Sequence, residues 1–195
     1  MRRTLLFAVA VLVLAAPISA ESVQTFVGNT TGGPTWTRPD QGNPPVAGTH
    51  SGVHYAVQSF KLLAASSCYI VSAQSYDGFI VLYSGGFNPA SPLTNAVSGD
   101  DDGVLGIGTS YIPNGGPSSP STLSLAAGTY YLVTTSYSSS EFGAFQNTIH
   151  CQANSPVAID TPVLVQGSCG FYIGRPLEDT VCLGNRFLVE IVDVT

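Results

Sequence analysis

Charged side chains are scarce in this chain, and positive ones most of all. Lys, Arg, Asp and Glu make up 9% of its 195 residues, with six basic residues against twelve acidic ones. Once Arg2 and Arg3 are removed with the leader described below, the net charge is about 4 − 12 = −8. Nucleic acid and anionic membranes are poor partners for such a surface, so we expect neither.

Long amphipathic helical patterns are also missing, whereas Gly, Pro, Ser and Thr are abundant. Short apolar segments joined by turns rich in these residues are typical of an all-β sandwich or barrel. The chain that remains after the leader is long enough for one such core with a short appended segment. We therefore predict an antiparallel β-sandwich followed by a short carboxyl-terminal β tail.

An apolar run near the amino terminus is too short to span a membrane. Residues 5–16 are apolar, follow Arg2 and Arg3, and lead into small residues at 17–20. This pattern predicts a secretory signal peptide over residues 1–20. We expect an exported protein, secreted or periplasmic, that begins near Glu21 and has no membrane span.

The strongest strand pattern covers residues 123–137. A turn at 126–128 leads into seven consecutive β-formers, 129–135, with bulky side chains on both faces, which predicts a central strand. Further strands are predicted at 53–62, 69–73, 78–83 and 144–151, with a long connection over 84–120. Residues 21–52 are predicted to follow the surface or form an edge, with Trp36 held in a groove of the core.

Four cysteines in an exported protein should be paired. Three connectivities are open to Cys68, Cys151, Cys169 and Cys182. We favour Cys68 with Cys151, which ties an early strand to a late one, and Cys169 with Cys182, which closes a local loop. No Cys-x-x-Cys or Cys/His spacing indicates zinc.

The histidines do not predict a metal site either. His50 and His54 lie in a segment that opposes a helix, and four residues of a strand span about 13 Å. These two side chains therefore cannot share one ion directly. We expect no metal role for them or for His150.

Sequence patterns for catalysis are weak. Gly-x-Ser-x-Gly is absent, and neither Ser110 nor Ser168 has the strand-turn-helix context that exposes a nucleophile. A paired-carboxylate hydrolase stays open, because several acids are able to converge in space: Asp77, Asp100, Asp101, Asp102, Glu141 and Asp160. An enzyme is nevertheless the less favoured interpretation, and we expect none.

A series of short motifs occurs in a set order. It includes Tyr-Asp-Gly-Phe-Ile-Val-Leu-Tyr at 76–83, Phe-Asn-Pro at 87–89, Asp-Asp-Gly at 101–103 and Leu-Ala-Ala-Gly-Thr-Tyr-Tyr-Leu-Val-Thr at 125–134. By their order and spacing, residues 34–151 resemble the bacterial pre-peptidase C-terminal (PPC) domain and its relatives. The resemblance implies a jelly-roll-like β-sandwich that accompanies other secreted proteins, often as a non-catalytic binding or folding module.

The resemblance has limits. Collagen-binding relatives use calcium and are attached to a protease, but no protease domain precedes the motifs here, so collagen binding is not implied. We divide the chain into a signal peptide at 1–20, a PPC-like sandwich at 21–151, and a segment at 152–195 that joins a linker to a disulfide-closed β element. That last segment, with a strand predicted at 187–194, is either the end of this protein or a fragment of a further module.

Three adjacent acids are predicted to form part of a calcium site. The carboxylates of Asp100, Asp101 and Asp102 repel one another, and a hard cation with six to eight oxygen ligands relieves that repulsion. The resemblance adds Asp77, because it places this residue at the start of a strand near the acidic loop. The alternative is a solvated acidic turn that protects a sheet edge from aggregation.

Two functions are consistent with these patterns. The first is a secreted, calcium-stabilised, non-catalytic module that binds an extracellular carbohydrate or protein surface through the exposed aromatic residues Tyr83, Phe87 and Tyr111. The second is a structural or interaction module of a larger exported protein, with no ligand of its own. A contiguous exposed aromatic patch favours the first, and a polar surface with an unpaired edge strand in the tail favours the second.

Overall fold

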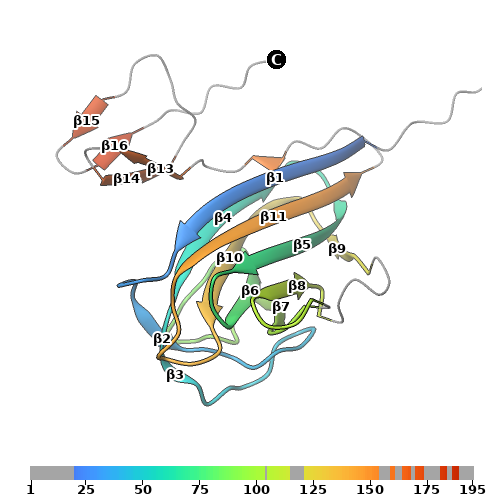
Figure 1. Cartoon of the computed structure of the whole chain (residues 1–195). Helices are drawn as coiled ribbons and strands as arrows, with labels where there is room; N and C mark the ends of the chain where they lie inside the picture. Colours follow the sequence, from blue (N-terminus) through green and yellow to red (C-terminus); the bar gives the residue numbers. More distant parts are fainter. Residues whose placement is uncertain are drawn as a thin grey trace, which may run out of the picture.

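Two antiparallel five-stranded sheets pack face to face as a β-sandwich (Figure 1). In this computed structural model, residues 21–103, 105–114 and 121–152 are described with their side chains, whereas Ala20, Ala153 and the strands after residue 158 are described by backbone alone. The predicted all-β sandwich is confirmed, and the described residues contain no helix. Accordingly, no described helix is long and apolar enough to cross a membrane.

The first sheet joins the two ends of the sandwich in sequence. Its order is β1 (Ala20–Asn29), β11 (Ala144–Ala153), β5 (Ser66–Gln74) and β8 (Thr109–Ile112), and β9 (Leu123–Leu125) also pairs with β5. β1 is therefore an edge strand, as predicted for part of residues 21–52. The predicted closing strand is β11, which extends two residues beyond Cys151.

The second sheet is built around the segment with the strongest strand pattern. Its order is β12 (Ile159–Asp160), β4 (Ala56–Leu62), β10 (Gly128–Ser136), β6 (Gly78–Ser84) and β7 (Ala96–Asp100). β10 pairs along nearly its whole length with β4 on one side and β6 on the other. Its predicted central position is confirmed.

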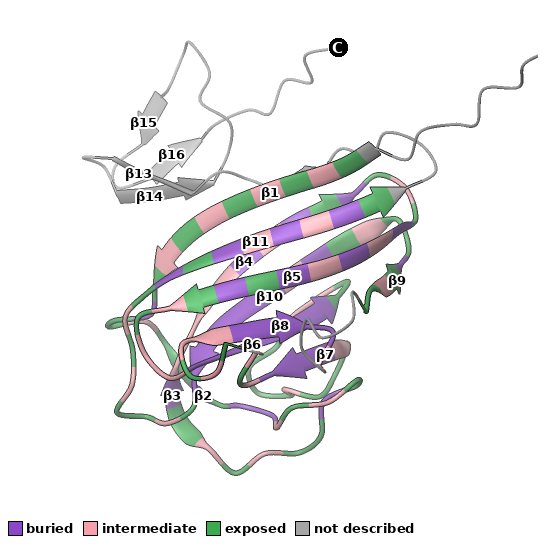
Figure 2. Ribbon diagram, turned by 45° about the vertical axis from the view of Figure 1, so that its right-hand side comes forward, coloured by how far each residue is buried: buried purple, intermediate pink, exposed green. Residues whose placement is uncertain are grey.

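The main core lies between the two sheets. Tyr130 and Leu132 of β10 meet Ile70 of β5 and Ile149 of β11, and all four are buried, as the purple stretches of these strands show (Figure 2). Fully burying a side chain such as Leu132 contributes about 1.5–3 kcal/mol. Hydrogen bonds also cross this core, since the Asn147 side-chain amide donates to the Thr134 hydroxyl at 2.7 Å.

A third layer covers the outer face of the second sheet. β2 (Thr35–Thr37) and β3 (Ser51–His54) pair with each other and bring Trp36 onto this face. Trp36 is 5% exposed and packs with Val81, Tyr83 and Val133. The predicted position of Trp36 in a groove of the core is confirmed. Because this layer covers the outer face of the second sheet, β10 is buried, and therefore apolar, on both faces.

Two predicted segments differ from the structure. The single strand predicted at 53–62 is interrupted at Tyr55, whose backbone amide donates to the Pro34 carbonyl, so that β3 pairs with β2 while β4 joins the second sheet. The connection predicted over 84–120 contains β7 and β8. Both strands are short, and β7 includes Ser98 and Gly99, residues whose strand state comes from pairing with β6 rather than from local propensity.

The disulfide predicted between Cys68 and Cys151 is present, joining directly opposed residues of β5 and β11 in the core. The second predicted pair involves Cys169, which lies outside the described residues. In the tail, β13 (Leu164–Gly167) pairs with β14 (Gly170–Ile173), and β15 (Val181–Leu183) with β16 (Arg186–Leu188). Of the strand predicted at 187–194, only the first two residues are described.

Candidate metal centre

Three carboxylates converge at one end of the sandwich, where strands of both sheets end. Asp77 immediately precedes β6, and Asp101 and Asp102 immediately follow β7. Because β6 and β7 are antiparallel neighbours, the start of one lies beside the end of the other. Each of the three residues offers one carboxylate oxygen, and these oxygens all lie within 4.8 Å of one another.

Two of these carboxylates have an oxygen without a partner. Asp77 Oδ1 and Asp101 Oδ1 are shielded from solvent and accept no hydrogen bond from the described residues. An unsatisfied buried acceptor costs free energy, and more so when it carries charge. The two oxygens therefore lower the stability of the fold unless a cation or a proton satisfies them.

The pKa values of Asp101 and Asp77 also show that their surroundings disfavour the ionised carboxylates. Burial raises the pKa of Asp101 to about 6, the Arg38 guanidinium opposes that rise, and the charges of Asp102, Asp77 and Asp100 add to it. Burial also raises the pKa of Asp77, with further contributions from Glu141 and Asp102. Both ionised carboxylates are therefore destabilised by their surroundings.

A tight loop holds Asp101 and Asp102 in place. The Ser110 hydroxyl donates to the Asp101 carbonyl at 2.6 Å, and the Gly103 amide donates to the Thr109 carbonyl at 2.6 Å. Gly106 has φ 76°, a left-handed conformation that favours glycine. The loop returns the chain into β8 with the acidic residues fixed at its base.

Asp100 does not belong to this group, in contrast to the prediction. It is the last residue of β7, is 2% exposed, and its Oδ2 accepts a hydrogen bond of 2.7 Å from the Tyr111 backbone amide. Burial raises its pKa to about 6, although the bond from Tyr111 opposes the rise. Asp100 thus fixes β8 against β7 while its two neighbours turn into the loop.

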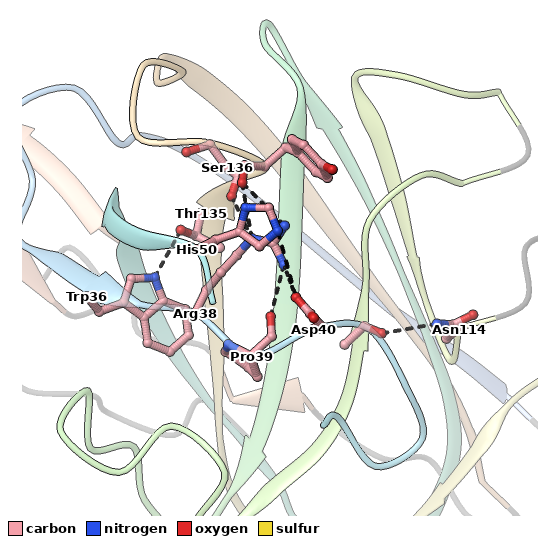
Figure 3. Close-up of polar contacts among 10 residues, drawn as sticks. Trp36, Arg38, Pro39, Asp40, His50, Asn114, Thr135 and Ser136 are labelled. Carbon is pink, nitrogen blue, oxygen red and sulfur yellow. Dashed lines mark hydrogen bonds and ion pairs between the residues drawn. The ribbon is translucent and has the colours of Figure 1, made fainter. Parts of the chain in front are cut away.

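Sequence reasoning missed Arg38, which follows β2 and is 2% exposed (Figure 3). Its guanidinium donates to the Ser136 and Pro39 carbonyls at 3.0 and 2.9 Å, approaches Asp40 Oδ1 at 3.4 Å, and lies 4.1 Å above the centre of the Phe79 ring. Arg38 is one of only four basic residues after residue 20, which singles it out in the sequence, whereas its burial depends on how the chain around β2 folds. Arg38 supplies fixed positive charge near Asp101 and Asp77.

The predicted aromatic ligand residues do not form an exposed patch. Tyr83 of β6 is fully buried beneath the third layer, and its hydroxyl donates to the Pro92 carbonyl at 2.7 Å. Phe87 is half-buried and packs against Tyr83 and Trp36. Tyr111 is 5% exposed and lies on the other sheet, with its ring stacked on Tyr69. The prediction of exposure is wrong for Tyr83 and Tyr111, because neighbouring segments cover strand faces that the sequence alone leaves open.

Two exposed apolar side chains lie in the loop that follows Asp101 and Asp102. Leu105 and Ile107, in the loop between β7 and β8, are 82% and 72% exposed. Ile107 lines a depression of about 370 Å³ together with Asp77, Gly108 and Glu141. The same end of the sandwich therefore carries both an acidic cluster and exposed apolar surface.

The remaining candidate residues have other contacts. His54 Nδ1 lies 2.8 Å from the Gly33 carbonyl oxygen, and His150 Nδ1 lies 3.0 Å from Glu21 Oε1. The His50 ring packs on Tyr137. Ser110 is buried, whereas Ser168 and the side chain of Asp160 lie outside the described residues.

Comparison with known proteins adds no relative to this description. No family model matches the chain, and no curated protein shows significant sequence similarity to it.

Proposed function

We propose that this protein is an exported, non-catalytic binding module whose sandwich is stabilised by calcium held by Asp77, Asp101 and Asp102. The observation that carries the proposal is the pair of shielded, unpartnered oxygens, Asp77 Oδ1 and Asp101 Oδ1, grouped with Asp102. The leader over residues 1–20 supports export. The motif resemblance to PPC domains agrees with a secreted, non-catalytic role.

Calcium suits this site better than other common metals. The three side chains of the cluster offer oxygen only, and calcium takes six to eight oxygen ligands in flexible geometry. A divalent cation would satisfy both buried oxygens and favour the ionised forms that burial now disfavours. Arg38 relieves the cluster only in part, because its direct contacts are to backbone carbonyls and Asp40.

The binding surface that we propose is the loop around Leu105 and Ile107. Both side chains are exposed next to the carboxylates, and large exposed apolar residues beside a polar cluster are typical of protein interaction sites. This favours a protein surface over a carbohydrate, because Tyr83 and Tyr111, predicted to bind either ligand, are buried and the exposed side chains of this loop are aliphatic. Calcium would act on this surface by ordering the loop that carries Leu105 and Ile107.

A structural module without a ligand is the second candidate. Burial of Tyr83 and Tyr111 favours it, since it removes the aromatic patch that a binding module was predicted to expose. On this interpretation a cation held by the acidic cluster serves only to stabilise the fold, and the exposed loop has no partner.

Calcium titration into chelator-treated mature protein tests the metal site. We expect the melting temperature to rise with calcium concentration, because a ligand that binds only the folded state stabilises it by mass action. The double variant Asp101→Asn with Asp102→Asn should lose the rise. Glu21→Gln is the matched control, since it removes one negative charge near the opposite end of β1 and should keep the rise. Equal melting temperatures at millimolar calcium and in chelator would refute the site.

An array of extracellular matrix proteins and glycans, probed with and without calcium, tests the binding role. We expect binding to a protein on the array that is lost in the double variant Leu105→Ser with Ile107→Ser. Leu93→Ser, which alters an apolar side chain exposed elsewhere, should leave it unchanged. Binding of no component of the array would favour the structural candidate.

A further inference from the structure

A cavity of about 700 Å³ is lined by residues of β1, β4, β5 and β11. Figure 1 shows β1 and β4 on the same side of the molecule, β1 at the edge of one sheet and β4 in the other. β12 pairs with β4 only at Lys61 and Leu62. The cavity lies toward the opposite end of β4, and the residues that define it are Phe26, Gly28, Asn29, Ala56, Phe145 and Gln146.

The sequence accounts for the shape of this cavity. Phe26 and Phe145 supply apolar walls, while Gly28 and Ala56 have little or no side chain to fill the space between the sheets. A Cβ atom built on Gly28 would lie 2.3 Å from the Phe145 ring, so that glycine is what lets the ring lie against β1. A larger side chain at position 56 would occupy part of the space, whereas one at position 28 would collide with the Phe145 ring.

The lining indicates the class of ligand. None of the lining residues described carries a charge; of the polar ones, Asn29 and Gln146 are exposed, and Gln58 is buried. The volume falls within the range of about 300–1,000 Å³ that is usual for small-molecule sites. The net charge of about 4 − 12 = −8 after removal of the leader disfavours an anionic ligand.

We propose that this cavity binds the hydrocarbon part of a neutral amphiphile, with the polar end of the ligand at the opening beside Asn29 and Gln146. The described lining offers no charged partner, so a charged group in the interior would be unpaired, which is strongly unfavourable. The hydrocarbon replaces water against Phe26 and Phe145, and the open side accommodates the part of the molecule that stays hydrated.

The test is a displacement experiment on the mature protein. The fluorescent apolar probe N-phenyl-1-naphthylamine is bound first, and a monoacylglycerol or the fatty acid of the same chain length is then added below its aggregation concentration. We expect saturable probe binding, with displacement by the monoacylglycerol at lower concentration than by the fatty acid. Absence of probe binding would overturn the proposal, and equal or tighter binding of the fatty acid would overturn the assignment to a neutral ligand.

Cavity-filling variants locate the binding site. Ala56→Phe should weaken probe binding by about tenfold or more by occupying the space. Ala90→Phe, the matched control, adds the same group in an exposed loop and should bind as the wild type does. If circular dichroism shows that Ala56→Phe does not fold, the smaller change Ala56→Leu is decisive. Unaltered binding in a folded Ala56 variant would place the probe elsewhere and refute the proposal.

Discussion

The carboxylate of Asp100 accepts a hydrogen bond from the backbone amide of Tyr111 at 2.7 Å, so the first of three adjacent acids ties two strands together. The sequence offers Asp100, Asp101 and Asp102 as one cluster. The structure divides them, because Asp100 still belongs to β7 while Asp101 and Asp102 have already entered the loop.

This division predicts different phenotypes for neighbouring acids. Asp100→Ala should lower the free energy of unfolding by about 1–3 kcal/mol, because the buried Tyr111 amide loses its partner. The calcium-dependent rise in melting temperature should persist in this variant. Urea unfolding and calcium titration measure the two effects separately. Loss of the calcium response in Asp100→Ala, with Asp101→Asn unaffected, would contradict the assignment.

Stability without calcium should fall as the pH rises from about 4 to 6. Burial raises the pKa values of Asp100 and Asp101 to about 6 in the fold, from 3.8 for a fully solvated aspartate. In this window the unfolded state has released protons that the folded state still holds, so the free energy of unfolding decreases with pH and levels off above 6.

Urea midpoints in chelator, at pH 4, 5, 6 and 7.5, measure this dependence. The double variant Asp100→Asn with Asp101→Asn should lose the part of the slope due to these two groups, and Glu21→Gln should retain it. Calcium should flatten the slope as well, because it favours the ionised form of Asp101. Identical pH profiles for the wild type and the double variant would refute the prediction.

Trp36 should be the most sensitive position of the third layer. Trp36→Ala removes a buried ring that packs on Tyr55 and Phe87, with an expected cost of about 3–5 kcal/mol. Trp36→Phe keeps a ring but loses the 3.1 Å hydrogen bond from Nε1 to the Thr135 hydroxyl, which should cost about 1 kcal/mol more than the change in ring size alone. Urea unfolding followed by circular dichroism gives both values. A cost below 1 kcal/mol for Trp36→Ala would show that this layer is dispensable.

Peptide mapping under non-reducing conditions should recover Cys68 linked to Cys151 and Cys169 linked to Cys182. Replacing Cys68 and Cys151 together by Ala should cost about 2–5 kcal/mol, because the bond closes a loop between residues 83 positions apart. Replacing Cys169 and Cys182 together should leave the sandwich melting transition nearly unchanged. Recovery of a Cys151 to Cys169 peptide would show that the tail folds back and that the boundary near residue 152 is misplaced.

The sequence predicts the secondary structure of a segment when the segment's own residues determine that structure, and fails when pairing with a distant strand determines it. β10 was predictable, because Tyr130 to Thr135 are all β-formers and are apolar or small on both faces. β7 was not, since Ser98 and Gly99 are extended only because β6 lies beside them and Gly42 pairs across Gly99.

The same distinction applies to the candidate site. The association of Asp77 with the acidic loop was expected from motif order, and the grouping in space agrees with it. The separate role of Asp100 depends on where β7 ends, and the burial of Tyr83 depends on where residues 35–54 fold. The spacing of residues along the chain encodes neither the role of Asp100 nor the burial of Tyr83. The burial of Arg38 could not be predicted for the same reason, because it also depends on the tertiary fold.

The pairing of β1 with β11 has a consequence for the order in which the protein forms. Ala20 lies opposite Ala153 and Asn29 opposite Ala144, so the first described strand of the chain pairs with the last strand of its sheet. Contacts this distant in sequence slow folding, because a long loop must close before they form. A nascent chain that stops before β11 has no partner for β1. β1 therefore stays unpaired until β11 has been synthesised, and the first sheet is completed only then.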